Sequence, residues 1–587
     1  MNIAAQLREL LAPQRWLLLV IAASVLAGAA LEVLPPLIVR QVVDAHLAVG
    51  HAAGLLRLGL VYLLVVAAQQ GLGAVSAYVT AVAAQRALRD LRLRLFAHLQ
   101  RLPVRYFDTT PLGDTIGRCT ADIDTIDRLF SSGIANLVAD LARLLTITLA
   151  MLLLSPTLTL LAALAVPPLL GFTRWFQRRV LAAERAQRRA VGELNTTLAE
   201  TLGGAEVIRA FGREHYFAQR FRGALQATLD AYLEATRYAA VYTPLMVLLA
   251  SAIVALLLWA GSEAALAGLG LSIGTLTAFV LLFRRFFTPI TNLGEEWQTV
   301  QSALAGAERV FQLLALPADE PGDAAEASSF QTSDAAPLIE LTNLSFGYQD
   351  GFPVLRDVSL RVHAGEHVAL VGRTGAGKST IMHLAGGLCA PGSGQVRVAA
   401  MDPCAMTDTQ RRERLGVVPQ TLQLFGGSVL ENLTMGDGSV TRAAVEAAAM
   451  ATGAHAIIQA LPQGYDTPLR AGDGGVVLSA GQRQLLALTR ALVHQPCVLL
   501  LDEATAAIDH ASDAAFRAAL RRDAHNAQRA VLIVAHRLAT ACEADRVLVL
   551  DDGRIVEQGP PAALIHRGGR FSALLALEAA GWDWHSR

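Results

Sequence analysis

The chain has 587 residues, which is too long for one compact core and implies two or more domains. Hydrophobic residues make up 53% of it and charged residues 17%, and both values are typical of proteins with membrane-spanning segments. The formal net charge of −1 gives no electrostatic basis for a nucleic-acid partner. The five cysteines are scattered without a Cys-x-x-Cys pair, which indicates a reduced cytosolic setting and not a disulfide framework.

Six mostly apolar stretches of about 20 residues occur in the first 300 positions, and each is long enough to cross a bilayer. They cover residues 16–39, 58–84, 134–154, 158–176, 241–260 and 272–293. The first stretch is not followed by a small-residue cleavage site, so we interpret it as a membrane helix and not as a removable signal. Only Ser155, Pro156 and Thr157 separate the third stretch from the fourth, which predicts a tight hairpin.

Arginines are concentrated in two long segments, one between the second and third stretches and one between the fourth and fifth. Because positive charge marks the cytoplasmic side, we expect a multi-pass protein of the cytoplasmic (inner) membrane with both termini inside. Each segment has about 50 residues or more and is rich in helix-forming Ala, Leu, Arg and Glu. The second to fifth spans are therefore predicted to continue as helices into the cytoplasm, and to turn near residues 107–114 and 203–204.

One more helix is predicted over residues 295–316. Residues 317–337 then shift to Pro, Gly, Ser, Asp and Ala without periodicity, which is typical of a linker. The sequence thus predicts a six-helix transmembrane domain over residues 1–316, a linker over 317–337 and a soluble domain over 338–587. Every motif in the soluble part occurs once.

The strongest local motif is Gly-Arg-Thr-Gly-Ala-Gly-Lys-Ser-Thr at residues 372–380. It follows a strand-like run and precedes a helical one, which is the context of a phosphate-binding loop. Backbone N–H groups of such a loop and the helix N-terminus bind phosphates, while Lys378 adds positive charge and Ser379 offers its hydroxyl to Mg²⁺. The predicted nucleotide-binding residues here are Gly372, Thr374, Gly375, Gly377, Lys378, Ser379 and Thr380.

A second motif is an apolar, strand-like run that ends in two carboxylates, Asp502 and Glu503. Asp502 suits Mg²⁺, and Glu503 can accept a proton from the water that attacks the γ-phosphate. The alternative is an acidic pair at a strand end that merely faces solvent. The phosphate-binding loop in the same domain argues for the catalytic interpretation.

Immediately upstream, Leu-Ser-Ala-Gly-Gln at residues 478–482 resembles the Leu-Ser-Gly-Gly-Gln signature of the ATP-binding cassette family. The resemblance extends over nearly the whole chain, because the six stretches, the two long loops and Ala-Phe-Gly-Arg-Glu at residues 210–214 resemble the exporter branch with the type IV fold. It implies a membrane α-helical domain fused to an α/β P-loop cassette that hydrolyses ATP with Mg²⁺. It also implies that the turns of the long loops dock on the cassettes as coupling helices.

The resemblance assigns roles to residues that would otherwise pass for ordinary core positions. Tyr348 would stack on adenine, Gln420 would sense Mg²⁺, and His536 would hold the γ-phosphate. The signature of each chain would face the nucleotide of a second subunit, so that the site is complete only in a dimer. The implied catalytic residues are Glu503, His536 and Gln420, the implied Mg²⁺ ligands are Ser379, Gln420 and Asp502, and the implied signature contacts are Ser479, Gly481 and Gln482.

The signature departs from the family at Ala480, where glycine is usual. An added methyl at a close backbone approach should loosen the contact with the opposite nucleotide, although alanine is small enough to be tolerated. An intact Glu503 beside an altered signature resembles one subunit of a heterodimer with one proficient and one impaired site. We therefore favour a heterodimer over a homodimer.

The predicted function is ATP-driven export of an amphiphilic or hydrophobic small substrate (a drug, lipid or peptide) across the lipid bilayer, as one half of a dimer. A siderophore-type importer on the same scaffold and a cassette-gated channel or regulator stay open, while the six spans exclude a soluble cassette protein acting on DNA or ribosomes. Arg284 and Arg285 lie about 18–20 Å along the sixth span. We interpret them as a structural pair, the alternative being a contact for an acidic head group.

Overall fold

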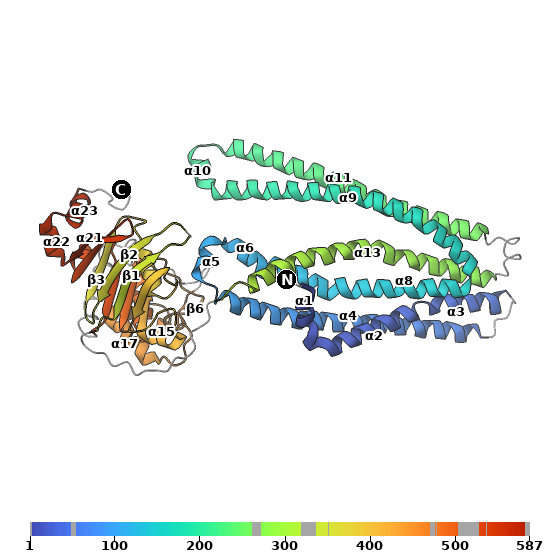
Figure 1. Ribbon diagram of the computed structural model, residues 1–587. Coiled ribbons are helices and arrows are strands. Elements are labelled where there is room, and N and C mark those ends of the chain that lie inside the picture. Colours follow the sequence, from blue (N-terminus) through green and yellow to red (C-terminus); the bar gives the residue numbers. More distant parts are fainter. Residues whose placement is uncertain are drawn as a thin grey trace. The chain divides into compact units, whose positions relative to one another are not determined.

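The computed structural model describes residues 3–48, 54–260, 272–318, 336–349, 351–469, 476, 478–502, 528–535 and 537–580. The chain forms two compact units (Figure 1). One unit comprises Met1–His98 and Gly113–Leu316, and the other comprises Leu99–Leu112 and Pro317–Arg587. The short segment Leu99–Leu112, which contains most of the turn predicted near residues 107–114, thus groups with the soluble part of the chain.

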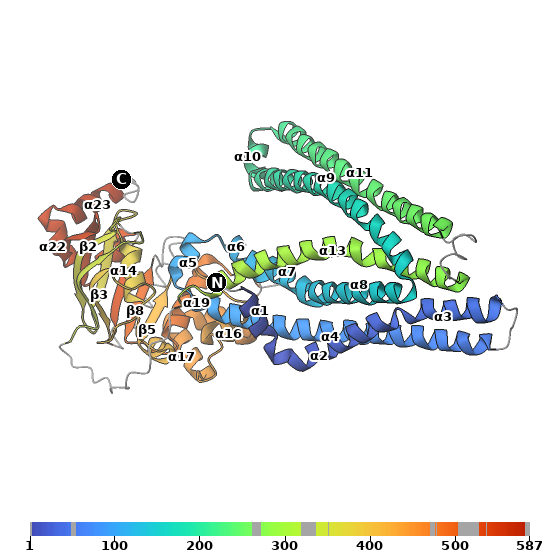
Figure 2. The same ribbon diagram turned by 45° about the vertical axis from the view of Figure 1, so that its right-hand side comes forward.

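The first unit is helical, and its four longest helices have 42 to 48 residues each. Figures 1 and 2 show α9 and α11 running side by side, with α10 at the turn between them. The helices are α1 (Ile3–Leu11), α2 (Arg15–Leu31), α3 (Leu34–Val42), α4 (Leu55–Leu99), α6 (Leu112–Gly117), α7 (Ile123–Arg128), α8 (Ile134–Leu154), α9 (Pro156–Gly203), α10 (Ala205–Ala210), α11 (Glu214–Ala260) and α13 (Ile273–Leu314). Short turns of other helix types, η1 (Ala12–Gln14), η2 (Val43–Leu47), η3 (Arg118–Asp122) and η4 (Leu129–Gly133), connect some of them.

Five stretches of the described residues are long and apolar enough to cross a membrane. They are Ala5–Leu47, Leu55–Leu99, Leu112–Leu154, Glu214–Trp259 and Ile273–Leu314, and they contain five of the six predicted spans. The remaining one, residues 158–176, lies in α9 and stays a prediction. The long helical extensions of the second, fourth and fifth spans are confirmed, because α4, α9 and α11 run well beyond the apolar stretches without interruption. The extension before the third span is helical too, but it changes between α-helical and π-helical turns through α6, η3, α7 and η4.

The predicted hairpin between α8 and α9 is present, and its geometry follows from Ser155 and Pro156. Ser155 has an extended backbone, with φ −160° and ψ 105°, so the helix stops there. Its hydroxyl accepts a hydrogen bond from the amide of Leu158 at 3.3 Å, which caps the new helix. Pro156 occupies the first helical position, where its missing N–H leaves no helical bond unmade.

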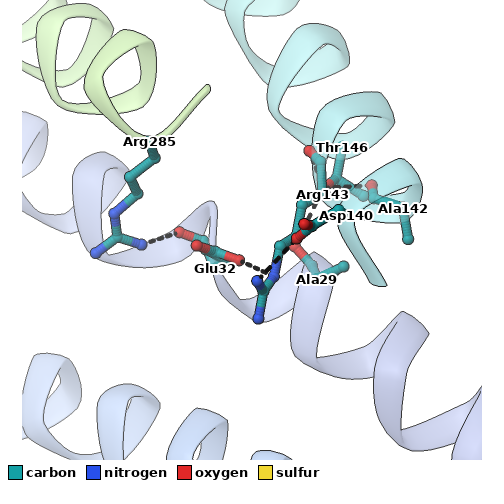
Figure 3. A network of polar contacts seen from close by, with 7 residues as sticks. All are labelled: Ala29, Glu32, Asp140, Ala142, Arg143, Thr146 and Arg285. Atoms are coloured by element: carbon teal, nitrogen blue, oxygen red, sulfur yellow. Dashed lines mark hydrogen bonds and ion pairs between the residues drawn. The ribbon is translucent and has the colours of Figure 1, made fainter. Parts of the chain in front are cut away.

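The first predicted span is not one straight helix, because it is broken at Glu32 and Val33, just before Pro35 and Pro36 in the first turn of α3. In a continuous helix the carbonyl of Glu32 would accept a hydrogen bond from the amide of residue 36, and proline has no N–H to donate. Arg285 of α13 supplies the missing donor, with its Nη1 at 2.7 Å from that carbonyl oxygen (Figure 3). Arg285 therefore has a structural partner inside the bundle, whereas the side chain of Arg284 is exposed.

The carboxylate of Glu32 continues this network toward α8 (Figure 3). Its Oε2 lies 3.1 Å from Nε of Arg143, and Nη1 of Arg143 lies 3.2 Å from Oδ1 of Asp140. The Asp140 side chain is only 2% exposed, so Arg143 is placed to compensate a carboxyl group that water does not reach. Thr146, one turn further along α8, donates to the carbonyl of Ala29 in α2 at 3.2 Å. Together these contacts join α2, α8 and α13 at the proline break.

A second polar contact fixes the beginning of α13. Asp44, in the η2 turn after α3, accepts hydrogen bonds from the amide of Gly274 at 2.9 Å and from the hydroxyl of Ser272 at 2.6 Å. A carboxylate at a helix N-terminus is favourable for both hydrogen bonding and the helix dipole. A β-carbon at Gly274 would lie 2.6 Å from the Arg40 carbonyl oxygen and from the Asp44 carboxyl carbon, so glycine lets the two segments approach.

The second unit contains a six-stranded sheet in the order β11-β10-β3-β9-β8-β5, a three-stranded antiparallel sheet in the order β2-β1-β4, and a short β6-β7 pair. The strands β10, β3, β9, β8 and β5 are mutually parallel, and β11 pairs antiparallel with β10. The strands are β1 (Ile339–Phe346), β2 (Leu355–Val362), β3 (His367–Gly372), β4 (Ser393–Val398), β5 (Leu415–Val418), β6 (Gly427–Ser428), β7 (Pro468–Leu469), β8 (Val498–Asp502), β9 (Ala530–Val534), β10 (Arg546–Asp551) and β11 (Arg554–Gly559). The helices and turns are α5 (Val104–Thr109), α14 (Lys378–Ala385), α15 (Asp408–Arg414), α16 (Val429–Thr434), α17 (Arg442–Thr452), α18 (Ala454–Gln459), η5 (Gly464–Asp466), α19 (Ala480–Leu492), α21 (Leu538–Cys542), α22 (Pro561–Arg567) and α23 (Arg570–Ala579).

The central strands are buried on both faces, as parallel strands covered on both sides must be. Alternate residues of one strand enter different cores: Leu499 and Leu501 of β8 join one hydrophobic cluster, and Leu500 joins the other. The first cluster also contains residues of α16 to α19, and the second contains residues of the three-stranded sheet and of α14. The sheet is therefore the common wall of two cores, and its strand ends are held rigidly.

Removing the side chain of Arg285 should leave the Glu32 carbonyl without a donor. We expect Arg285→Ala to lower the free energy of unfolding by about 1–3 kcal/mol, the usual cost of a buried unsatisfied polar group. Pro36→Ala would restore an amide N–H to that carbonyl, so the double variant should be less destabilised than the two single effects predict. Thermal unfolding of the detergent-purified protein measures this, with Arg284→Ala as the matched control. Simple additivity of the two costs would contradict the assignment.

Adding a methyl group at Gly274 should force α13 away from η2. We expect Gly274→Ala to cost about 1–3 kcal/mol of stability through overpacking, and to lower the thermal midpoint accordingly. Gly71→Ala in α4 is the control, because a β-carbon there would have no neighbour within 4 Å. Equal midpoints for the two variants would show that Asp44 and Gly274 are not in close contact.

Candidate nucleotide-binding site

The phosphate-binding loop connects the end of β3 to the beginning of α14, as predicted from the motif. Three of its glycines have positive φ, namely Gly372 at 156°, Gly375 at 83° and Gly377 at 103°. A β-carbon at Gly372 would collide with the carbonyl oxygen of Leu550, and one at Gly377 would lie 2.6 Å from Cδ2 of Leu355. The loop can therefore curl tightly only with glycine at these positions.

Lys378, the first residue of α14, is 6% exposed and points back over the loop. Its ammonium group donates to the carbonyl oxygens of Gly372 at 2.7 Å and Arg373 at 2.8 Å. These contacts hold a cation next to the amide groups at the start of the helix. The combination of a buried ammonium group and helix N–H donors is suited to polyphosphate.

Asp502 ends β8 and lies next to the same helix. Its Oδ1 is 3.4 Å from the hydroxyl of Ser379, so two oxygen groups face one another at the sheet edge. Burial raises the pKa of Asp502, and the Ser379 hydrogen bond and the charges of His383 and Lys378 oppose that shift. Carboxylate and hydroxyl oxygens are ligands that Mg²⁺ prefers, so the two residues fit the ion that the sequence predicts.

Gln420 is exposed and follows β5 by two residues. Because β5 pairs in parallel with β8, with Val418 opposite Leu501, Gln420 and Asp502 leave neighbouring strands at the same edge. Ligands of open α/β sheets bind outside the carboxyl ends of the strands. The topology thus brings the Gln420 segment to the side of the sheet where the phosphate loop and Asp502 lie.

Tyr348 follows β1, in the three-stranded sheet, and its hydroxyl reaches α14. The Oη atom lies 3.3 Å from Oγ1 of Thr380 and 3.3 Å from Nδ1 of His383. Burial raises the pKa of the Tyr348 hydroxyl, the Thr380 hydrogen bond opposes this, and the carboxylate of Asp108 adds to the rise. His383 is not among the residues predicted from the sequence, although its position one helical turn after Thr380 places both side chains on one face of α14.

The signature residues form the N-terminus of α19. The hydroxyl of Ser479 accepts from the amide of Gln482 at 3.2 Å, and Oε1 of Gln482 accepts from the amide of Ser479 at 2.9 Å, which is a capping box. Ser479 is exposed and Gly481 is buried. Ala480 is the first residue of the helix, where alanine fits without backbone strain. The effect of its methyl group on an opposite nucleotide stays a prediction.

Two predicted catalytic residues, Glu503 and His536, lie outside the described residues. Glu503 comes directly after Asp502, and His536 comes two residues after Val534, the last residue of β9. The register pairs Asp502 with Val534, so both residues follow the aligned ends of neighbouring parallel strands. Their roles stay predictions.

Comparisons with known proteins agree with this geometry. The profile of the ABC transporter transmembrane region matches residues 17–290, and the profile of the ABC transporter matches residues 355–506. An ATP-dependent lipid A-core flippase from Aromatoleum aromaticum is 35% identical over 88% of this chain and 84% of its own length. A fatty acid ABC transporter ATP-binding/permease protein from Mycobacterium bovis is 32% identical over 83% of this chain and 76% of its own length.

Among solved structures, that of a bacterial Atm1-family ABC exporter with ATP bound superposes with a TM-score of 0.76. It is 28% identical in sequence, and the match covers 97% of this chain and 99% of the other. Fold, phosphate loop, signature and extended similarity thus all agree, and the chain belongs to the ATP-binding cassette transporters, with a transmembrane region fused to an ATP-hydrolysing cassette.

Proposed function

We propose that this chain exports an amphiphilic, lipid-like substrate across the cytoplasmic membrane as one half of a dimer, using Mg²⁺ and ATP. ATPase-coupled transport follows from membership of the family. The observation that carries the proposed chemistry is the meeting of the phosphate loop with the Ser379–Asp502 pair at the carboxyl edge of the sheet. The arginine-rich long loops support a cytoplasmic location for the cassette and both termini.

Each residue of the site has a proposed task in hydrolysis. Lys378 and the loop amides bind the β and γ phosphates, and Ser379, Asp502 and Gln420 hold Mg²⁺, which supplies charge neutralisation on the phosphate oxygens. Glu503 takes the proton of the attacking water, and His536 orients the γ-phosphate. Asp502 is buried at the end of β8 and next to the Ser379 hydroxyl, so the two oxygen groups are already side by side for the ion.

The signature helix is the proposed contact with the second subunit. The N-terminus of α19 is exposed at Ser479 and carries a partial positive charge, so it suits the phosphates of a nucleotide bound to the opposite cassette. ATP between two cassettes would favour the closed dimer by its higher affinity for that state. The altered signature at Ala480 beside the intact Glu503 supports a heterodimer.

The proposed substrate class rests on the transmembrane unit and on the relatives. An open groove of about 340 Å³ lies between α2, α3 and α8, and apart from Arg40 and Thr146 its wall is apolar. Such a wall accepts an acyl chain better than a polar solute. Two of the relatives are named for lipid A-core and fatty acid, which are amphiphiles.

Substitution of Glu503 tests the chemistry. We expect Glu503→Gln to keep ATP binding and lower ATP turnover by at least about a hundredfold, because a general base is lost. Lys378→Ala should instead weaken ATP binding itself, because the ammonium group contacts the phosphates. Purified dimer in proteoliposomes containing lipid A or fatty acid provides both ATPase and transport readouts. Hydrolysis near the parental rate by Glu503→Gln would remove Glu503 from the mechanism.

Expression of this chain alone tests the partner. The heterodimer proposal predicts negligible substrate-stimulated ATPase activity from the single chain, restored by a sister chain with a complete Leu-Ser-Gly-Gly-Gln signature. Size-exclusion chromatography with ATPase assays measures both properties, and Ala480→Gly in this chain is the matched control for the signature. A stable homodimer with vigorous stimulated activity would refute the heterodimer and leave the ATPase assignment intact.

A further inference from the structure

One hydroxyl group links two parts of the cassette that come from different sheets. Tyr348 belongs to the loop after β1 of the antiparallel sheet, whereas Thr380 and His383 belong to α14, directly after the phosphate loop of the parallel sheet. The Tyr348 Oη atom is 3.3 Å from the Thr380 hydroxyl and 3.3 Å from Nδ1 of His383. The tip of the aromatic ring is thereby attached to the helix that begins at the phosphates.

The other side of the same ring is held by an aromatic neighbour. Phe346, the last residue of β1, packs against the hydrophobic cluster that lies under the antiparallel sheet. Its ring meets that of Tyr348 edge to face, with centroids 5.0 Å apart and planes at 86°. This geometry is the favourable one for two aromatic rings. Tyr348 is thus restrained at its ring by Phe346 and at its hydroxyl by α14.

We propose that His383 is a positioning residue for the nucleotide base, which together with Thr380 holds the Tyr348 hydroxyl and so preorganises the ring for stacking. This inference rests on the proposed role of Tyr348 as the base platform. The distribution of side chains on α14 agrees with it, because Ser379 points to Asp502 while Thr380 and His383 share the contact with Tyr348. Neighbouring residues of α14 would then contact the metal, the phosphates and the residue that stacks on the base.

The size of the effect follows from the geometry. Both contacts to Oη are 3.3 Å long, which is beyond the usual 2.5–3.0 Å of a hydroxyl hydrogen bond, so each contributes modestly. Without them the ring must be ordered when the base binds, and ordering one side chain costs about two- to tenfold in affinity. The loss should appear in the binding of ATP and not in the rate of the chemical step, because no contact with the reacting γ-phosphate changes.

The test compares Tyr348→Phe, His383→Leu and the double variant in the full-length transporter dimer. Each single variant should raise the KM for ATP about two- to tenfold, Tyr348→Phe should leave kcat unchanged, and the double variant should bind ATP no more weakly than either single variant. His383→Asn, whose amide can replace Nδ1, should restore most of the affinity. Inorganic tripolyphosphate, which has no base, should inhibit all four variants with the parental inhibition constant.

Four results would count against the proposal. Additive losses in the double variant, or an equally weakened tripolyphosphate inhibition, would mean that His383 acts on the phosphate loop and not through Tyr348. A parental KM for Tyr348→Phe with a large loss for Tyr348→Ala would keep the ring as the base platform and overturn only the role of its hydroxyl. A parental KM for Tyr348→Ala would refute the platform itself, which is an error in the proposed site and distinguishable from the other outcomes.

Discussion

The transmembrane unit depends on the rule that a backbone polar group without water must find a partner inside the protein. Helices satisfy this rule by themselves, which is why apolar stretches and their extensions form helices of more than 40 residues. The rule fails locally at Pro36, which cannot donate to the Glu32 carbonyl. Arg285 of α13 supplies the missing hydrogen-bond donor, and the carboxylate of the same Glu32 pairs with Arg143. The break would weaken a single helix, but the contacts made there join α2, α8 and α13.

In the cassette, the structure must hold polar side chains in fixed positions at the carboxyl edge of the parallel sheet. Its central strands are buried on both faces, so their carboxyl ends cannot move independently of two hydrophobic cores. Asp502 is held in the same way, because it is the last residue of β8. The phosphate loop obtains it differently, through glycines whose positive φ and close contacts with Leu550 and Leu355 leave the backbone little freedom. Preorganisation of this kind reduces what must be ordered when a nucleotide binds.

Local patterns in the sequence predicted those features that depend on neighbouring residues. The hairpin at Ser155 and Pro156, the loop before Lys378 and the strand that ends at Asp502 all follow from short-range chemistry. The break at residues 32–33 was not predicted, because hydropathy measures only how apolar a stretch is. The two prolines at positions 35 and 36 were the available sign, since proline has no N–H for a helical hydrogen bond. The contact of Tyr348 with His383 could not be predicted, since it depends on how two separate sheets pack around α14. Arg285 and Glu32 are 253 positions apart, and no periodicity connects them.

The way in which nucleotide binding reaches the membrane is constrained by chain continuity. The segment Leu99–Leu112 belongs to the cassette unit, and its Asp108 contributes to the electrostatic environment of Tyr348. Helix α4 runs without interruption from Leu55 to the start of this segment, and α13 ends at Leu314, three residues before the cassette unit resumes at Pro317. Nε2 of His98 and the carbonyl oxygen of Leu313, at the ends of these two helices, are 3.1 Å apart. This contact ties the C-terminal end of α4 to the end of α13 inside the helical unit, next to two of the three points where the chain passes between the units.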